Sequence, residues 1–98
     1  MVINKKQDGS ALVVALEGRL DTTTAPELEQ ELKSSLDGIT DLTLDMTNLD
    51  YISSAGLRVL LSAHKIMRKQ GKTKVTNASE IVREVFEVTG FSDILTIA

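Results

Sequence analysis

Short apolar and alternating segments along this chain predict a series of strands. Residues 2–7 form a candidate strand, and the Asp-Gly pair at residues 8–9 is typical of a hairpin turn. Residues 11–17, ALVVALE, are apolar almost without interruption, which indicates a strand buried on both faces. The alternating segment DLTLDM at residues 41–46 and the short segment at residues 74–76 predict two further strands.

Segments with helical periodicity separate these strands. The first predicted helix follows Thr24, which forms a capping-box pattern with Glu27 three residues later. A second helix is expected over residues 55–70, and a third follows an N-cap at Ser79 and ends at Gly90. The predicted apolar sides are Leu28, Leu32 and Leu36 in the first helix, Leu57, Leu60, Leu61, His64 and Met67 in the second, and Ile81, Val82, Val85 and Phe86 in the third.

The order of these elements predicts a single small α/β domain over residues 1–98. The order is β-β-α-β-α-β-α, and the tail at residues 93–98 adds a candidate final strand. Strands that alternate with helices indicate a mixed sheet with helices packed against it. In such sheets functional sites lie at the carboxyl ends of strands, where loops enter helices. The loops at residues 18–24 and 48–56 meet this description.

The composition fits a globular domain and excludes several classes of function. The chain has 98 residues, of which 42% are hydrophobic and 26% charged. A formal net charge of -3 argues against general nucleic-acid binding, which requires a basic surface. The absence of cysteine excludes disulfides and thiolate catalysis. No apolar run approaches ~20 residues and no secretory signal is visible, so we expect a cytoplasmic protein without membrane insertion.

The residue types give little support to catalysis or metal binding. The single histidine, His64, excludes a multi-histidine metal site, and no glycine-rich phosphate-binding motif occurs. A helix rise of ~1.5 Å per residue separates His64 from Ser54 by about 15 Å, too far for a serine–histidine pair. Turn or strand-end roles are favoured for Asp45 and Asp50, whereas Asp21 remains either a turn residue or a site residue. We therefore expect no enzyme, no metal and no cofactor.

The segment YISSAGLR at residues 51–58 stands where a strand passes into the second helix. A serine N-cap is worth ~1 kcal/mol, which accounts for one of Ser53 and Ser54. It leaves Gly56 unexplained, because glycine in a first turn costs up to ~1 kcal/mol unless another backbone or a partner must come close. A helix N-terminus also receives a phosphate well. Phosphoserine here would add ~1.5 to 2 negative charges and would break a contact without unfolding the helix.

Three motifs in this sequence together resemble a known family. They are GRLD at residues 18–21, LDMTNLDYISSAGL at residues 44–57, and GF at residues 90–91. In this order they resemble the STAS domain of bacterial anti-sigma factor antagonists. The resemblance covers nearly the whole chain, and its central motif combines a strand, a loop of small residues and an apolar helix.

The resemblance implies a partner-switching protein with a phosphorylated serine. In that family an anti-sigma factor that is also a serine kinase modifies the antagonist, the unmodified antagonist binds this kinase and frees the sigma factor, and a PP2C-type phosphatase restores the active form. The family motif places the acceptor at Ser54. Ser53 stands where the family has an aspartate, and it is the alternative acceptor. The implied partner-binding residues are Asp21, Thr22, Ser53, Ser54, Ala55, Gly56 and Arg58.

Two other interpretations remain open at this point. Stand-alone STAS domains also serve as non-catalytic subunits of other complexes, such as lipid-transport ABC systems, and in partner switches without a sigma factor. In that case Ser54 would be only a helix cap. A small-ligand or nucleotide-binding module is the third interpretation, and no triphosphate-binding loop supports it.

Overall fold

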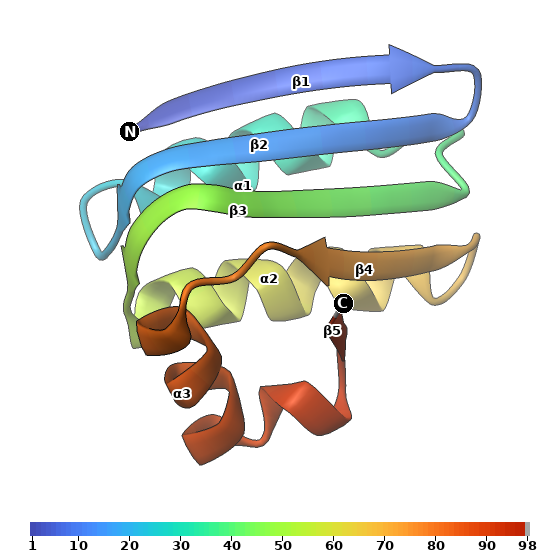
Figure 1. The fold of residues 1–98 in the computed structure, drawn as a ribbon. Helices are drawn as coiled ribbons and strands as arrows, with labels where there is room; N and C mark the ends of the chain where they lie inside the picture. The colour runs from blue at the N-terminus through green and yellow to red at the C-terminus, as the bar shows by residue number, and fades with distance from the viewer. Residues whose placement is uncertain (98) are drawn as a thin grey trace.

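The computed structural model describes residues 1–97 and contains a five-stranded sheet. Figure 1 shows helices beside this sheet. Its elements are β1 (Val2–Asp8), β2 (Ala11–Leu20), α1 (Ala25–Ser35), β3 (Asp41–Ile52), α2 (Ser54–Met67), β4 (Lys72–Thr76), α3 (Glu80–Thr89), the 3-10 helix η1 (Phe91–Asp93) and β5 (Thr96–Ile97). The predicted α/β order is confirmed, and the tail adds the candidate final strand. That prediction extended to residue 98, which lies outside the described residues.

The sheet is mixed, as predicted, and follows the order β1-β2-β3-β4-β5. Strands β1 and β2 form an antiparallel hairpin, whereas β2, β3, β4 and β5 run parallel to one another. At the end of the long β2–β3 ladder Leu20 lies opposite Ile52. The carboxyl ends of these two strands therefore meet at one edge of the sheet, on the left in Figure 1.

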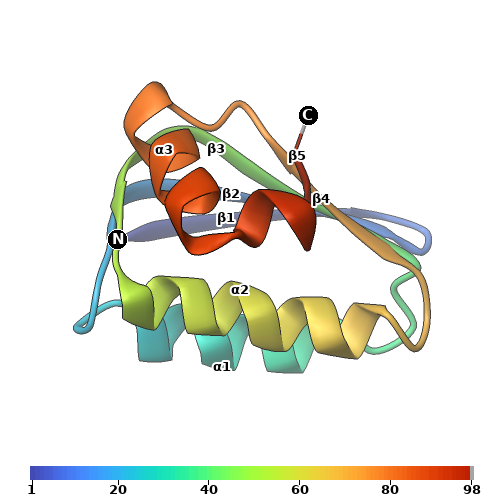
Figure 2. The ribbon, with the colours of Figure 1, turned by 90° about the horizontal axis from the view of Figure 1, so that it is seen from below.

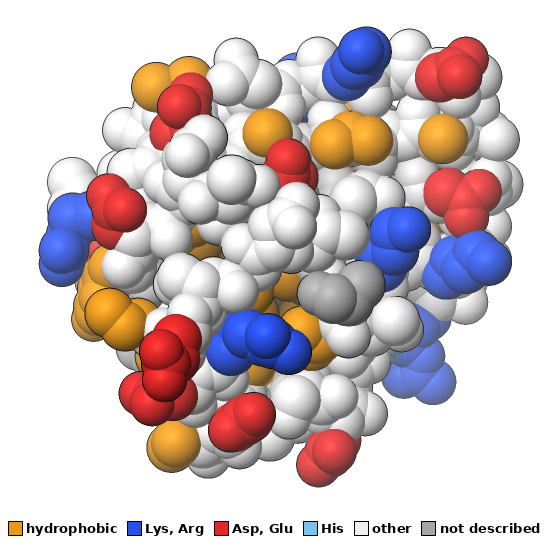
Figure 3. All heavy atoms as spheres, viewed as in Figure 1, with side chains coloured by type: hydrophobic (Ala, Val, Ile, Leu, Met, Phe, Trp, Pro, Cys, Tyr) orange, Lys and Arg blue, Asp and Glu red, His pale blue; other side chains and the backbone are white. Residues whose placement is uncertain are grey.

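Helices α1 and α2 lie side by side against one face of the sheet (Figure 2), whereas α3 lies apart from them and packs against β3. The buried side chains of β2, among them Leu12, Val14 and Leu16, alternate with more exposed ones, and Val13 is 38% exposed. The prediction that this strand is buried on both faces is therefore wrong. The opposite face carries no helix over β2, and Figure 3 shows hydrophobic side chains there among scattered charges. The small side chains of Ala11 and Ala15 made this face resemble a buried one in the sequence.

The ends of α2 and α3 agree with the predicted signals to within a few residues. Helix α2 begins at Ser54 and ends at Met67, one residue earlier and three residues earlier than expected. Ser79 is the N-cap of α3, where its hydroxyl accepts a hydrogen bond from the N–H of Val82 at 3.3 Å. Gly90 ends that helix in the left-handed conformation, with φ 80°, which glycine adopts without strain.

Two predictions are wrong, one about the cap of α1 and one about the buried side of α3. The hydroxyl of Thr24 makes no capping bond to α1, so the capping box with Glu27 is absent. It instead accepts a hydrogen bond from the N–H of Asp21 and donates to the carbonyl of Arg19. Ile81, placed on the buried side of α3 by its periodicity, is 61% exposed, because α3 faces the core through Val82 and Phe86.

The hydrophobic core fills the space between the helix-covered face of the sheet and the helices. Among its fully buried side chains are Leu16, Leu28, Leu44, Leu60 and Phe86, drawn from both the sheet and the three helices. None of the helices within residues 1–97 has the length and apolar character that a membrane span requires.

Candidate functional site

The two predicted loops, residues 18–24 and 48–56, are shorter than expected, because residues 18–20 belong to β2, residues 48–52 to β3 and residues 54–56 to α2. The connections that remain lie together at the carboxyl edge of the sheet. The chain leaves β2 after Leu20 and passes into α1, and it leaves β3 after Ile52 and passes into α2. The N–H of Ser53 donates a hydrogen bond to the carbonyl of Leu20 at 2.9 Å. This bond ties the start of α2 directly to the residue that precedes Asp21.

The two serines at the start of α2 have different structural roles. Ser53 is the N-cap, in an extended conformation, and its hydroxyl accepts a hydrogen bond from the N–H of Gly56 at 3.4 Å. Ser54 is the first residue of the helix and is exposed to solvent. Ser53 therefore accounts for the expected cap, and Ser54 presents its hydroxyl at the positive end of the helix dipole.

Gly56 is explained by packing inside the molecule. A Cβ atom at this position would lie 2.6 Å from Cγ of Leu20 and 3.0 Å from Cγ1 of Ile52. Both of these side chains are buried, so they have little space into which to move. Only glycine lets the first turn of α2 lie this close to the ends of β2 and β3. The surfaces that require it belong to this chain, so a partner is not needed to explain this glycine.

Asp21 organises the loop between β2 and α1. Its Oδ1 atom accepts hydrogen bonds from the N–H of Thr23 at 3.0 Å and the N–H of Thr24 at 3.1 Å. The hydrogen bond from the backbone of Thr24 is the main cause that holds the pKa of Asp21 below its ordinary value of 3.8. The Oδ2 atom makes no such loop bond and lies 3.9 Å from Nε of Arg19. Asp21 thus serves as a turn residue through one oxygen and keeps the other available at the surface.

Arg19 and Tyr51 are site neighbours that the sequence analysis did not identify. Their backbones lie opposite each other in the β2–β3 ladder. The guanidinium of Arg19 lies 4.5 Å from the centre of the Tyr51 ring, within the range of a cation–π interaction. Arg19 therefore contacts both an aromatic ring and the carboxylate of Asp21. The side-chain period of two in strands does place Arg19 and Tyr51 on one face, but their pairing depended on a register that the sequence did not reveal.

A shallow groove of about 330 Å³ runs between the first halves of α1 and α2. It is lined by Thr22, Ala25, Pro26, Glu29, Ala55, Arg58, Val59 and Ser62. Three of the predicted partner-binding residues, Thr22, Ala55 and Arg58, line this groove. Thr22 and Arg58 are exposed and Ala55 is half-buried, whereas the predicted Gly56 is buried beneath them.

The other titratable residues considered from the sequence do not join this site. Asp45 accepts hydrogen bonds from the hydroxyl of Thr47 at 2.6 Å and the amide of Asn77 at 3.2 Å, which lower its pKa. Asp50 is exposed in the last part of β3, and His64 is half-buried in the last turns of α2. Among residues 1–97 no cluster of His, Cys, Asp and Glu has the arrangement of a metal site.

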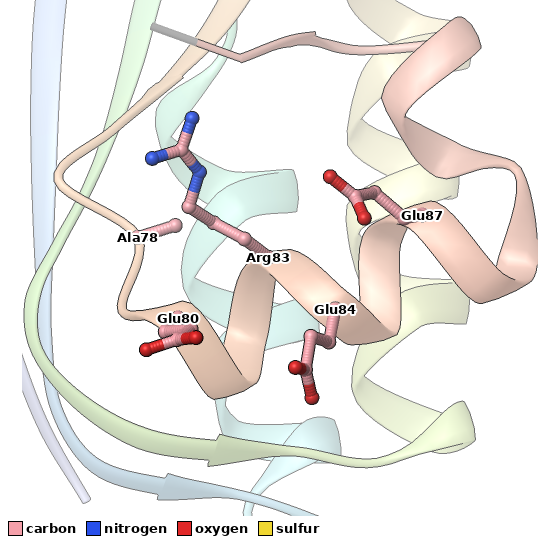
Figure 4. Close-up of a pocket in the computed structure, with 5 residues that line it drawn as sticks. All are labelled: Ala78, Glu80, Arg83, Glu84 and Glu87. Carbon is pink, nitrogen blue, oxygen red and sulfur yellow. The ribbon is translucent and has the colours of Figure 1, made fainter.

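A larger hollow, of about 470 Å³, lies beside α3 (Figure 4). Its lining residues are Ala78, Glu80, Arg83, Glu84 and Glu87. The four charged side chains are exposed and point in different directions, so they do not converge on one point. This hollow is a solvated acidic face of α3 and not a ligand cavity.

Comparison with known proteins finds relatives that match most of this chain. The family model of the STAS domain matches residues 2–98. The Bordetella bronchiseptica protein BtrV is 43% identical over 95 residues, which cover 95% of this chain and 81% of BtrV. The anti-sigma-B factor antagonist of Bacillus subtilis is 31% identical over 97 residues, which cover 98% of this chain and 89% of that protein.

Solved structures have the same fold. The anti-sigma factor antagonist SpoIIAA in its unphosphorylated form matches with a TM-score of 0.87 at 20% identity, over 99% of this chain and 88% of SpoIIAA. The phosphorylated form of SpoIIAA matches with a TM-score of 0.77 at 19% identity, over 99% of this chain and 91% of that chain.

The substitution Gly56→Ala should destabilise the protein. Overpacking costs about 1–3 kcal/mol, of which the better helix propensity of alanine recovers up to ~1 kcal/mol. Gly71→Ala is the matched control, since a Cβ there would meet the carbonyl of Thr40 at the opposite end of the sheet. Urea unfolding should show a loss of stability in both variants, and amide shifts of Ser53 and Asp21 should change only in Gly56→Ala. Undiminished stability of Gly56→Ala would show that Leu20 does not restrict this turn.

The carboxyl group of Asp21 should titrate below pH 3.8, because its ionised form accepts the loop hydrogen bonds. A pKa lowered on folding means that this carboxylate stabilises the loop above the unfolded pKa. That contribution is lost as the pH falls through the folded pKa. Carbon-detected NMR of the side-chain carboxyl measures the midpoint. Thr24→Ala keeps the backbone N–H and, of the bonds to this carboxylate, removes only the one from the Thr24 hydroxyl to Oδ1 at 3.3 Å, so it should move the midpoint only slightly towards 3.8. A midpoint above 3.8 in the parent protein would contradict this loop structure.

Proposed function

We propose that this chain, which belongs to the STAS domain family, acts as an anti-sigma factor antagonist controlled by phosphorylation of Ser54. Relatives at 31% and 32% identity from Bacillus subtilis and Listeria monocytogenes are named anti-sigma-B factor antagonists. In this proposal the unmodified chain binds an anti-sigma factor serine kinase in the cytoplasm and releases the sigma factor. The chain itself binds and does not catalyse.

The different roles of Ser53 and Ser54 carry this proposal. A kinase needs an acceptor hydroxyl that it can reach, and Ser54 is exposed at the start of α2. A phosphate on Ser54 leaves the capping bond between Ser53 and Gly56 intact. Its negative charge also lies at the positive end of the helix, where anions are favoured. A phosphate on Ser53 would disturb the cap itself, which favours Ser54 over the alternative acceptor.

The surface around Ser54 has the mixed character that a switchable protein interface needs. Asp21, Thr22 and Arg58 supply polar and charged groups, and Ala55 supplies an apolar contact in the groove between α1 and α2. Polar rim groups set the orientation and rate of association more than the affinity. A phosphate placed among them adds negative charge and must be desolvated in a complex, which weakens binding. The same serine can therefore switch an interface without a change of fold.

The chemical step belongs to the kinase in this proposal. The kinase moves the γ-phosphoryl group of ATP to Oγ of Ser54, the hydroxyl proton leaves, and ADP is released. A PP2C-type phosphatase hydrolyses the phosphoserine and restores the binding form. No cofactor of this chain takes part in either step.

Treatment with the anti-sigma factor kinase and ATP should add one phosphate to the parent protein. The phosphate should be absent from Ser54→Ala and present in Ser53→Ala, which intact-protein mass spectrometry detects. Ser53→Ala should lose ~1 kcal/mol of unfolding free energy, since it removes the N-cap, and Ser54→Ala should lose less. Phosphorylation of Ser54→Ala at the parent rate would exclude Ser54 as the acceptor. Absence of phosphate under every condition, together with co-purification of transporter subunits, would instead favour a non-catalytic subunit.

Ser54→Asp should weaken binding of this chain to the anti-sigma factor kinase by about tenfold or more, equivalent to ~1.4 kcal/mol. Ser54→Asn is the matched control, because it has nearly the same size as aspartate without the charge. Isothermal titration calorimetry compares the two dissociation constants. Equal affinities of the Asp and Asn variants would show that charge is not the basis of the switch.

A further inference from the structure

Helix α2 presents a solvent-exposed stripe that contains Ser54 and positive charges. Residues three or four positions apart lie on one side of a helix. The exposed residues of α2 at this spacing are Ser54, Arg58, Ser62 and Lys65, and Lys69 follows just past the end of the helix. Helix α2 contains no aspartate or glutamate at all. Ser54, the proposed phosphate acceptor, is therefore the first residue of a stripe that contains no acidic residue.

Arg58 is the one cation of this stripe that helix stability does not explain. Lys65 and Lys69 lie near the C-terminus of α2, where positive charge interacts favourably with the helix dipole. Arg58 lies just past the first turn of α2, where a cation gains nothing from the dipole. The dipole therefore does not account for the charge of Arg58.

No carboxylate of the described residues pairs with Arg58 either. Within residues 1–97 the ion pairs are Lys5–Glu31, Arg19–Asp21 and Lys33–Glu29, and none includes Arg58. Glu29 lines the same groove as Arg58, but its carboxylate contacts Nζ of Lys33 at 2.8 Å. By contrast, Arg83 shares its helix α3 with Glu80, Glu84 and Glu87, although their side chains point in different directions (Figure 4). The unmodified protein therefore leaves the guanidinium of Arg58 free for another anion.

We propose that Arg58 binds the phosphate of phosphorylated Ser54 and so forms an ion pair within α2. This inference rests on the proposed function, because it assigns Arg58 a role in the regulation of the same site. Ser54 and Arg58 are four residues apart, a spacing that brings Cβ atoms within about 5–6 Å. The anion is N-terminal to the cation, which is the more favourable order. A guanidinium also binds phosphate oxygens in a bidentate manner, which a lysine cannot do.

This ion pair gives one modification two effects on the binding surface. The phosphate adds negative charge at Ser54, and it also withdraws the guanidinium of Arg58 from the groove between α1 and α2. A partner that contacts Arg58 in the unmodified protein would therefore lose that contact. The first turn of α2 would gain an internal ion pair at the same time. Phosphorylation would thus weaken the complex while it stabilises the free antagonist.

The titration of the phosphate tests this pairing directly. Phosphoserine is installed at position 54 by genetic encoding in the full chain, so that no kinase is needed. Phosphorus-31 NMR then measures the second pKa of the phosphate, which is about 6 without a partner. Neighbouring charges include Asp21 and Arg19 from the β2–α1 edge and Glu29 and Lys33 from α1, and these are the same in every variant. The comparison therefore isolates the contribution of the residue that is changed.

Arg58→Gln should raise the second pKa of the phosphate by roughly 0.3 to 1 unit relative to the parent, because it removes a cation that favours the dianion. Lys65→Gln is the matched control, since it removes one positive charge from the same stripe three turns away, and it should leave the pKa unchanged. Circular dichroism confirms that each variant is folded. Equal pKa values in the parent and Arg58→Gln would overturn the proposal, and so would an equal shift in Lys65→Gln, which would indicate a general effect of net charge.

This experiment and the test of the proposed function fail in different ways. If no anti-sigma factor kinase modifies Ser54, the proposed function fails, but the titration still measures whether Arg58 pairs with a phosphate. If the kinase modifies Ser54 and the titration shows no shift in Arg58→Gln, the switch operates without Arg58. In the expected case phosphorylation weakens partner binding by a smaller factor in Arg58→Gln than in Lys65→Gln. An equal factor in the two variants would contradict the withdrawal of Arg58.

Discussion

The close approach of α2 to the end of β2 is the constraint on which the site depends. Gly56 leaves no Cβ atom between the first turn of α2 and the buried side chain of Leu20. The hydrogen bond from Ser53 to the carbonyl of Leu20 fixes the same contact from the backbone. Because Asp21 follows Leu20 directly, this contact also determines where the loop between β2 and α1 lies. Two segments distant in sequence thereby form one surface at the carboxyl edge of the sheet, as in other sheets with parallel strands.

On this surface, different residues hold the structure and remain available for modification or binding. Ser53 caps the helix, and one oxygen of Asp21 accepts the hydrogen bonds that hold its loop. Both groups therefore have a structural role. The side chains of Ser54 and Arg58 are exposed and make no hydrogen bond or ion pair among the described residues. Groups of this kind can change charge or partner at little cost to stability. A regulatory protein of this small size requires that separation, because one or two kcal/mol is a large part of its total stability.

Much of this architecture followed from local signals in the sequence. The order of elements, the N-cap at Ser79 and the glycine stop at Gly90 depend on residues close in the chain, and they were predicted correctly. The burial of β2, the hydroxyl bonds of Thr24 and the packing reason for Gly56 depend on contacts between distant segments. Thr24 illustrates the difference, because its pattern fits a capping box, but its hydroxyl oxygen accepts a hydrogen bond from the N–H of Asp21 instead of one from the first turn of α1. The pairing of Arg19 with Tyr51 depended in the same way on the β2–β3 register.

The central claim is that Ser54, and not the capping Ser53, is the regulated hydroxyl of this protein. Fragmentation mass spectrometry of the parent protein from its native cells tests it most directly, because cleavage between the two serines assigns the phosphate to one of them. We expect a phosphate on the fragments that contain Ser54 in one regulatory state and no phosphate in the other. A phosphate on Ser53, or none in any state of the cells, would contradict it.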